Sequence, residues 1–175
     1  MKTSLLVCLL LLLRAATALA CSCVSTGGSE KQKIAAAYQQ DALIFVGQVL
    51  SAETIVTTDT VRVSDTGPAE QQIRLIRHEM VRYTFAVQRQ LKGVATGPTV
   101  LIASETASSS CGKQFKVGSK HLVYAFRVTQ KASLYGGAPE NIVPYYATSL
   151  CNRNQELNNV KRSELKQLAQ LAKAG

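Results

Sequence analysis

The chain has 175 residues, of which 46% are hydrophobic and 18% are charged. This length suits one domain with short additions, and the composition is too apolar for a disordered chain. The formal net charge of +9 indicates a basic protein. The composition therefore excludes a chain without a packed core, and the length argues against two assembled domains.

The first twenty residues have the pattern of a cleaved secretory signal. A positive start at Lys2 precedes an apolar run from Leu5 to Leu13, and Ala18-Leu19-Ala20 is a typical small-residue cleavage site. The run is about half as long as a membrane-spanning helix requires. We expect cleavage between Ala20 and Cys21 and a secreted protein, extracellular or periplasmic. Without the leader the chain keeps 18 basic and 11 acidic residues, a net charge of +7.

A cysteine directly after the cut also occurs in bacterial lipoproteins, where it is acylated. Those proteins prefer a large aliphatic residue three places before the cysteine and a small residue two places before it, whereas this chain has Ala18 and Leu19 there. The order favours free secretion over a lipid anchor. The distinction matters because acylation would block the amine of Cys21, and a blocked amine cannot bind a metal ion.

Four cysteines remain after the expected cleavage, namely Cys21, Cys23, Cys111 and Cys151. An even number in an oxidising compartment indicates two disulfides. A bond between Cys21 and Cys23 would close a ring too tight for relaxed geometry, so two long-range bridges are favoured. The pair at the start of the chain has three interpretations: structural crosslinks, a Cys-x-Cys redox pair, or part of a metal-binding N-terminus.

The third interpretation depends on position. Cleavage would make Cys21 the first residue, and its α-amine and carbonyl oxygen would then form a five-membered chelate for a metal ion held by another protein. An α-amine pKa of about 7.7 to 8.0 leaves a useful fraction neutral at physiological pH. Catalytic zinc in metalloproteases keeps a position open for water. An amine and carbonyl pair that displaced this water would stop the chemistry.

Hydrophobic periodicity predicts a helix near each end of the chain and strands between them. Residues 30–40, capped by Ser29, suit a short helix, and residues 154–174 suit an amphipathic helix packed on the rest of the protein. Strands are expected at 42–50, 53–63, 73–88, 99–103 and 121–128. Gly47 suggests a bulge in the first strand. The turn-forming residues 64–68 join the second and third strands in a hairpin.

The strand that starts at Ile73 has apolar residues at odd positions, which predicts one buried face along its length. Five or six strands with turns between them indicate an antiparallel barrel or sandwich. The sequence therefore predicts a mainly β fold with a short N-terminal helix and a C-terminal amphipathic helix.

An ordered set of short motifs resembles the inhibitory N-terminal, netrin-like domain of tissue inhibitors of metalloproteinases. The set comprises Cys21-Ser22-Cys23, residues 83–87 and 91–93, Ser109-Ser110-Cys111-Gly112, residues 118–124, and Leu150-Cys151. The resemblance covers residues 21–152. It divides the chain into a signal peptide at 1–20, an inhibitor-like domain at 21–152 and a C-terminal helix at 153–175. The second, cysteine-rich domain of the animal proteins is absent, which suggests a minimal one-domain relative that could be bacterial.

The resemblance implies a five-stranded OB-type barrel with disulfides Cys21–Cys111 and Cys23–Cys151. It also implies a function, the inhibition of zinc metalloproteases. Cys21 would chelate the zinc ion of the protease, and Ser22 would direct its side chain toward the primed specificity pocket. Cys23 and Val24 would extend the inhibitory edge. Ser109 and Ser110 would form the neighbouring contact ridge.

Other function classes have weaker support in the sequence. His78 and His121 are the only histidines and fall within predicted strands, and acidic pairs and phosphate-binding loops are lacking. We therefore expect neither an enzyme nor a protein with a cofactor or a metal ion of its own, and we expect a monomer that does not bind nucleic acid. The alternative is a non-inhibitory netrin-like module that docks to anionic polysaccharide, matrix or a partner protein. Its candidate cations are Lys113, Lys116, Lys120, Arg127 and Lys131.

Overall fold

The computed structural model describes residues 21–23, 27–62, 66, 68, 72–95, 97–106, 111–131 and 138–174. Its elements, in chain order, are α2 (Glu30–Gln40), β1 (Leu43–Arg62), β2 (Ile73–Lys92), β3 (Thr99–Glu105), β4 (Lys120–Lys131), β5 (Glu140–Ala147), β6 (Gln155–Glu156), a 3-10 turn (Leu157–Asn159) and α3 (Arg162–Ala174). None of the described helices is both long enough and apolar enough to cross a membrane.

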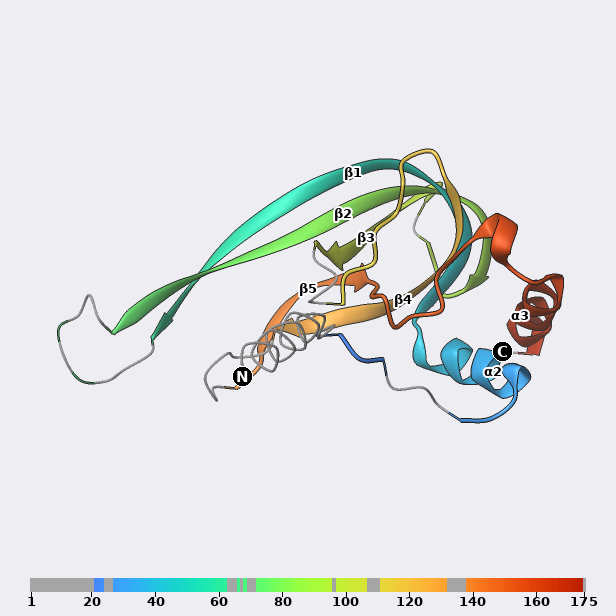
Figure 1. The fold of residues 1–175 in the computed structure, drawn as a ribbon, viewed down its shortest axis with the longest axis horizontal. Coiled ribbons are helices and arrows are strands. Elements are labelled where there is room, and N and C mark those ends of the chain that lie inside the picture. Colours follow the sequence, from blue (N-terminus) through green and yellow to red (C-terminus); the bar gives the residue numbers. More distant parts are fainter. Residues whose placement is uncertain are drawn as a thin grey trace, which may run out of the picture.

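Five strands close into an OB-type barrel (Figure 1). The sheet order is β1-β2-β3-β5-β4, and an additional pairing between β1 and β4 completes the ring. β3 and β5 are parallel, whereas the other neighbours are antiparallel. The short β6 pairs with the outer edge of β4. The expected mainly β fold, a barrel with a helix near each end of the chain, is confirmed.

Helix α2 has the expected bounds because its start is encoded locally. The Ser29 side chain accepts a hydrogen bond from the backbone of Gln32, and the Gln32 side chain accepts one from the backbone of Ser29. This reciprocal capping box satisfies two amide groups that a helix leaves unpaired at its N-terminus.

The two strands expected at 42–50 and 53–63 form one continuous strand, β1. Its pairing with β2 shifts register near Phe45, Gly47 and Ser51, and these irregularities bend β1 so that it pairs with both β2 and β4. A Cβ atom at Gly47 would lie 2.8 Å from the carbonyl oxygen of Ala86 and 2.8 Å from the Phe45 ring. Glycine is therefore required where the strand bends.

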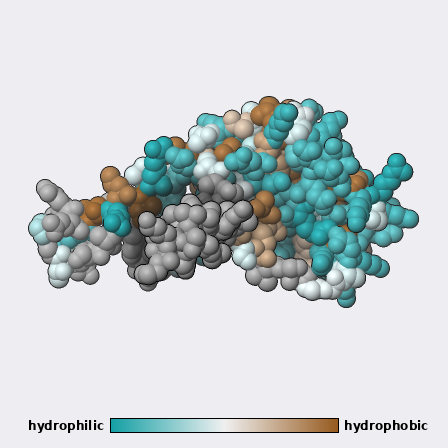
Figure 2. Space-filling view, in the orientation of Figure 1, coloured by the Kyte–Doolittle hydropathy of each residue, from teal (hydrophilic) through white to brown (hydrophobic). Residues whose placement is uncertain are grey.

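The β1–β2 hairpin extends beyond the barrel as a two-stranded arm, residues 56–62 and 73–79. The two strands stay paired out to Arg62 and Ile73, whereas β3 pairs with β2 only as far as Met80. Figure 1 shows the arm projecting away from the helices. Ile73 and Leu75 are 50% and 69% exposed, and Figure 2 shows hydrophobic side chains on the arm. The expected buried face is therefore wrong for the arm, because this part of β2 runs past the barrel.

Apolar side chains pack in two clusters, one inside the barrel and one between its outer wall and the helices. The inner cluster contains Leu43, Phe45, Val49, Tyr83, Phe85, Val100, Ile102, Phe115, Val123 and Ala125. The outer cluster contains Ile34, Ile44, Val46, Leu91, Leu122, Tyr124 and Leu168. Adjacent residues of β1 and β4 alternate between the clusters, so both faces of these strands are buried.

The C-terminal helix begins at Arg162 rather than at Asn154 as the apolar spacing suggested. Gln155 and Glu156 pair with β4 as strand β6, and the Asn154 side chain accepts a hydrogen bond from the Tyr124 backbone at 2.9 Å. Tertiary hydrogen bonds therefore replace the first two turns of the expected helix. The helix itself packs on the barrel through Leu168, as expected.

Strand β5 was not among the expected strands. Pro144 lies within it, and a proline lacks the N–H that a central strand needs. The ladder between β4 and β5 is irregular between Val128 and Gln130, which is where the interruption is accommodated.

Candidate functional site at the N-terminal cysteines

Two disulfides attach the first three residues of the expected mature chain to the barrel. Cys21 is bonded to Cys111 and Cys23 to Cys151, with Cα atoms 5.3 Å and 5.2 Å apart. This pairing is the one that the resemblance implied. The bridges lie side by side, since the Sγ atoms of Cys21 and Cys151 are 4.0 Å apart. Cys21 is half-buried, and Ser22 and Cys23 are exposed.

The loop that carries Cys111 is anchored to β3 and to the loop after β5. Cys111 has a φ of 61°, in the left-handed region that residues other than glycine seldom adopt. Its carbonyl oxygen accepts a hydrogen bond of 2.7 Å from the backbone of Leu150. Two residues later, the backbone N–H of Lys113 donates to the Ser104 hydroxyl at 2.7 Å. The bridge to Cys21 therefore starts from a restrained backbone.

The loop that carries Cys151 is held in turn by side chains before and after it. Thr148 donates its hydroxyl to the Tyr124 carbonyl at 2.7 Å, and Asn154 donates to the Thr148 hydroxyl at 2.7 Å. Asn152 accepts from the Ser149 backbone at 2.9 Å and donates to the Asp41 carboxylate at 2.7 Å. Both cysteine loops are thus fixed to the barrel before any partner binds.

Asp41 connects this loop to helix α2. Its side chain is 3% exposed, and burial raises its pKa from 3.8 to about 6, although the Asn152 hydrogen bond and nearby Lys92 favour the charged form. The Lys92 ammonium donates to the backbone carbonyls of Tyr38, Gln39 and Asp41. A cation is thus placed where the helix leaves its last carbonyl groups unpaired.

The sulfur atoms themselves do not form a metal site. The Sγ atoms of Cys21, Cys111 and Cys151 lie within 4.8 Å of one another, but all three belong to disulfides. The thiolate is the form of cysteine that ligates metals. The donors that remain at Cys21 are main-chain atoms, its nitrogen and its carbonyl oxygen.

The structure brings Cys21, Ser22 and Cys23 together with the two partner cysteines. Val24, Ser109 and Ser110, the other expected contact residues, lie outside the described residues. Leu150 was not expected as a contact. It precedes Cys151 and is 48% exposed. Its position next to a disulfide cysteine is the sequence feature that could have identified it as a contact residue. A hollow of about 190 Å³, lined in part by Phe126 and Cys151, lies nearby.

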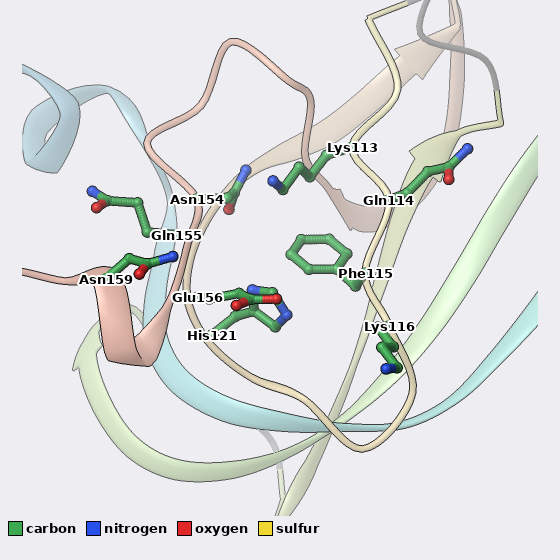
Figure 3. Close-up of a pocket in the computed structure, with 9 residues that line it drawn as sticks. All are labelled: Lys113, Gln114, Phe115, Lys116, His121, Asn154, Gln155, Glu156 and Asn159. Carbon is green, nitrogen blue, oxygen red and sulfur yellow. The ribbon is translucent and has the colours of Figure 1, made fainter.

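The cations expected for polysaccharide docking lie along β4 and in the loop before it. Lys131 forms an ion pair with Asp59 at 2.5 Å, Lys113 and Lys116 line a hollow of about 670 Å³ (Figure 3), and Lys120 lines a second hollow of about 480 Å³. Both histidines lie in strands, as expected: His78 is 3.5 Å from Asp59, and His121 is buried.

No protein-family model matches the chain, and no curated protein matches it.

Proposed function

We propose that the protein is a secreted inhibitor of zinc metalloproteases that acts through the main-chain nitrogen and oxygen of Cys21. The observation that carries the proposal is the pair of adjacent disulfides at Cys21 and Cys23, which hold a short exposed segment against two hydrogen-bonded loops. Disulfides of this kind persist in an oxidising compartment, which supports export and cleavage before Cys21.

In the proposed complex the α-amine and carbonyl of Cys21 bind the zinc ion of the protease and displace its catalytic water. Ser22 points toward the primed specificity pocket. Cys23, Val24, Ser109 and Ser110 contact the walls of the cleft, and exposed Leu150 adds apolar contact beside them. The disulfides contribute by preorganisation, because a segment that is already ordered loses less conformational entropy on binding.

The test moves the amine while leaving the rest of the protein unchanged. One alanine inserted ahead of Cys21 moves the α-amine, and with it the five-membered chelate, to a residue that no disulfide holds. We expect inhibition of a susceptible zinc protease to fall roughly a hundredfold or more, which corresponds to about 3 kcal/mol of lost binding free energy. The measurement is the inhibition constant against a panel of zinc metalloproteases.

An alanine added after Gly175 is the matched control and should leave the inhibition constant unchanged. Peptide mapping by mass spectrometry should find both disulfides in both variants and an unmodified Cys21 at the N-terminus of the exported protein. Equal potency of the two insertion variants would refute the mechanism. So would a wild-type protein that inhibits no member of the panel, or a first residue that is acylated.

A further inference from the structure

A hollow of about 670 Å³ lies between the loop before β4, the start of β4 and the segment around β6 (Figure 3). The Phe115 ring lies at its centre, with Lys113 on one side and His121 and Glu156 on the other, while Asn159 extends toward the space from the 3-10 turn. Gln114 and Lys116 also line the hollow, and the Gln114 side chain points outward. The proposed inhibitory mechanism uses none of these side chains.

His121 presents an unpaired nitrogen in this hollow. The residue is 3% exposed, and its Nδ1 atom is buried without a hydrogen-bond partner. The backbone of Gln155 acts against burial and raises the pKa of His121. A buried polar atom that stays unpaired costs about 1 to 3 kcal/mol. Such an atom indicates a partner that the chain itself does not supply.

The hydrogen bonds around His121 determine what that partner must offer. The Ser119 hydroxyl donates its single hydrogen to the Lys116 carbonyl, and the Nε2 atom of His121 lies 2.7 Å from the same hydroxyl oxygen. Nε2 donates to this oxygen in the tautomer that the hydroxyl favours, and Nδ1 then keeps a lone pair. Burial lowers the pKa of His121 and favours the neutral ring. A hydroxyl group suits Nδ1 in either tautomer, because a hydroxyl both donates and accepts.

The other side chains at the hollow mix donors and acceptors. Lys113 is only a donor, the Glu156 carboxylate is only an acceptor, and the Asn159 amide is both. The Lys113 ammonium lies 5.9 Å from the centre of the Phe115 ring. The Asn154 amide is fully used by Tyr124, Thr148 and Ser149.

This combination selects a class of ligand. A small anion would meet the carboxylate of Glu156, and a small cation would meet the ammonium of Lys113. Hydroxyl groups both donate and accept, so a neutral polyhydroxylated ring can pair with His121 in either tautomer, donate to Glu156 and accept from Lys113 and Asn159. We propose that this hollow binds one neutral sugar unit of a saccharide. The inference does not depend on the proposed inhibitory function.

The test is a titration with free sugars. Binding is monitored by NMR, through the amide resonances of the isotopically labelled chain that begins at Cys21. The probes are the methyl glycosides of glucose, galactose, mannose and N-acetylglucosamine. At least one should shift the resonances of residues 113–116, 121 and 154–159 in a saturable manner.

Two charge-removing variants distinguish the classes of ligand. Glu156→Gln and Lys113→Met should each weaken sugar binding about tenfold, as the loss of one hydrogen bond to a charged group predicts. Lys166→Met, on the exposed surface of α3, is the matched control and should bind like the wild type. An alanine ahead of Cys21 should leave sugar binding unchanged, so that this proposal and the inhibitory one fail separately.

Three results would overturn the assignment. The first is the absence of saturable shifts with every sugar. The second is binding that Glu156→Gln leaves unchanged. The third is a stronger response to acetate or sulfate than to sugars that increases in Glu156→Gln, which would make the hollow an anion site.

Discussion

At the level of single residues, the buried carboxyl of Asp41 links the protein's stability to pH. Burial is the largest influence on this group and raises its pKa from 3.8 to about 6. The folded protein therefore holds this proton more tightly than the unfolded chain does. The contribution of Asp41 to the free energy of unfolding is most favourable below pH 4, falls as the pH rises toward 6, and stays low above that.

Replacing Asp41 with asparagine tests this effect. The amide carries no charge, and its oxygen can still accept the hydrogen bond from Asn152. We expect the free energy of unfolding of Asp41→Asn to be higher than that of the wild type at pH 7, by on the order of 1 to 3 kcal/mol. Near pH 4 the two values should be equal.

Urea unfolding at the two pH values measures the difference, and Glu140→Gln, at an exposed position, is the control. A variant less stable than the wild type at pH 7 would mean that the carboxylate is needed, for example as the counter-ion of Lys92.

At the level of elements, helix α3 has both apolar and polar contacts with the rest of the protein. Leu168 is fully buried in the outer cluster. Glu164, one turn earlier, accepts a hydrogen bond of 2.8 Å from the Tyr124 hydroxyl. It also forms an ion pair of 3.1 Å with Arg153. Arg153 also reaches Glu30 on α2. Arg153 therefore links helix α2 to helix α3.

Truncating the apolar contact should weaken the whole protein. Leu168→Ala leaves a cavity in the outer cluster, and we expect the free energy of unfolding to fall by about 2 to 5 kcal/mol. Leu75→Ala removes the same atoms from a residue that is 69% exposed on the arm and should cost less than about 1 kcal/mol. Chemical unfolding of both variants gives the comparison. Similar losses would show that α3 adds little to the fold.

At the level of the whole molecule, the two disulfides join segments that are far apart in sequence. Cys23 and Cys151 are 128 residues apart, and Cys21 and Cys111 are 90 apart. While Cys21–Cys111 is intact, the second bridge closes an effective loop of about 40 residues, mainly the chain from Cys111 to Cys151. Chain-entropy estimates for such a loop give about 4 kcal/mol.

Removing only the second bridge separates its two contributions. The double variant Cys23→Ala and Cys151→Ala should lose up to about 4 kcal/mol in the free energy of unfolding, because the unfolded chain gains freedom. It should also lose inhibition at temperatures where it remains folded, since the segment from Ser22 onward is no longer held. Urea unfolding and the inhibition constant, measured on the same preparation, test both effects. A variant that keeps full potency would show that the first bridge alone orders the segment.

Local sequence signals were sufficient to predict features that are determined by residues close together in the chain. The cap at Ser29 indicated the start of α2, the alternation around Tyr83 and Phe85 indicated a strand, and Gly47 marked a bend. The even number of cysteines, together with the tight ring that Cys21 and Cys23 would form, pointed to long-range bridges. The helix start, the strand and the bend depend on neighbouring residues, and the expectation of long-range bridges depends on the number of cysteines and on ring geometry, so the sequence alone determined them.

Tertiary contacts decided the remaining features. Pro144 obscured β5, whose place between β3 and β4 depends on ladders formed by residues far away in the chain. Residues 154–161 have a helical apolar pattern, but pairing with β4 overrides it. The exposure of Leu75 follows from where β3 ends, and the unpaired nitrogen of His121 follows from which segments surround it. A periodicity reports which face could be buried, whereas only the assembled barrel determines what covers that face.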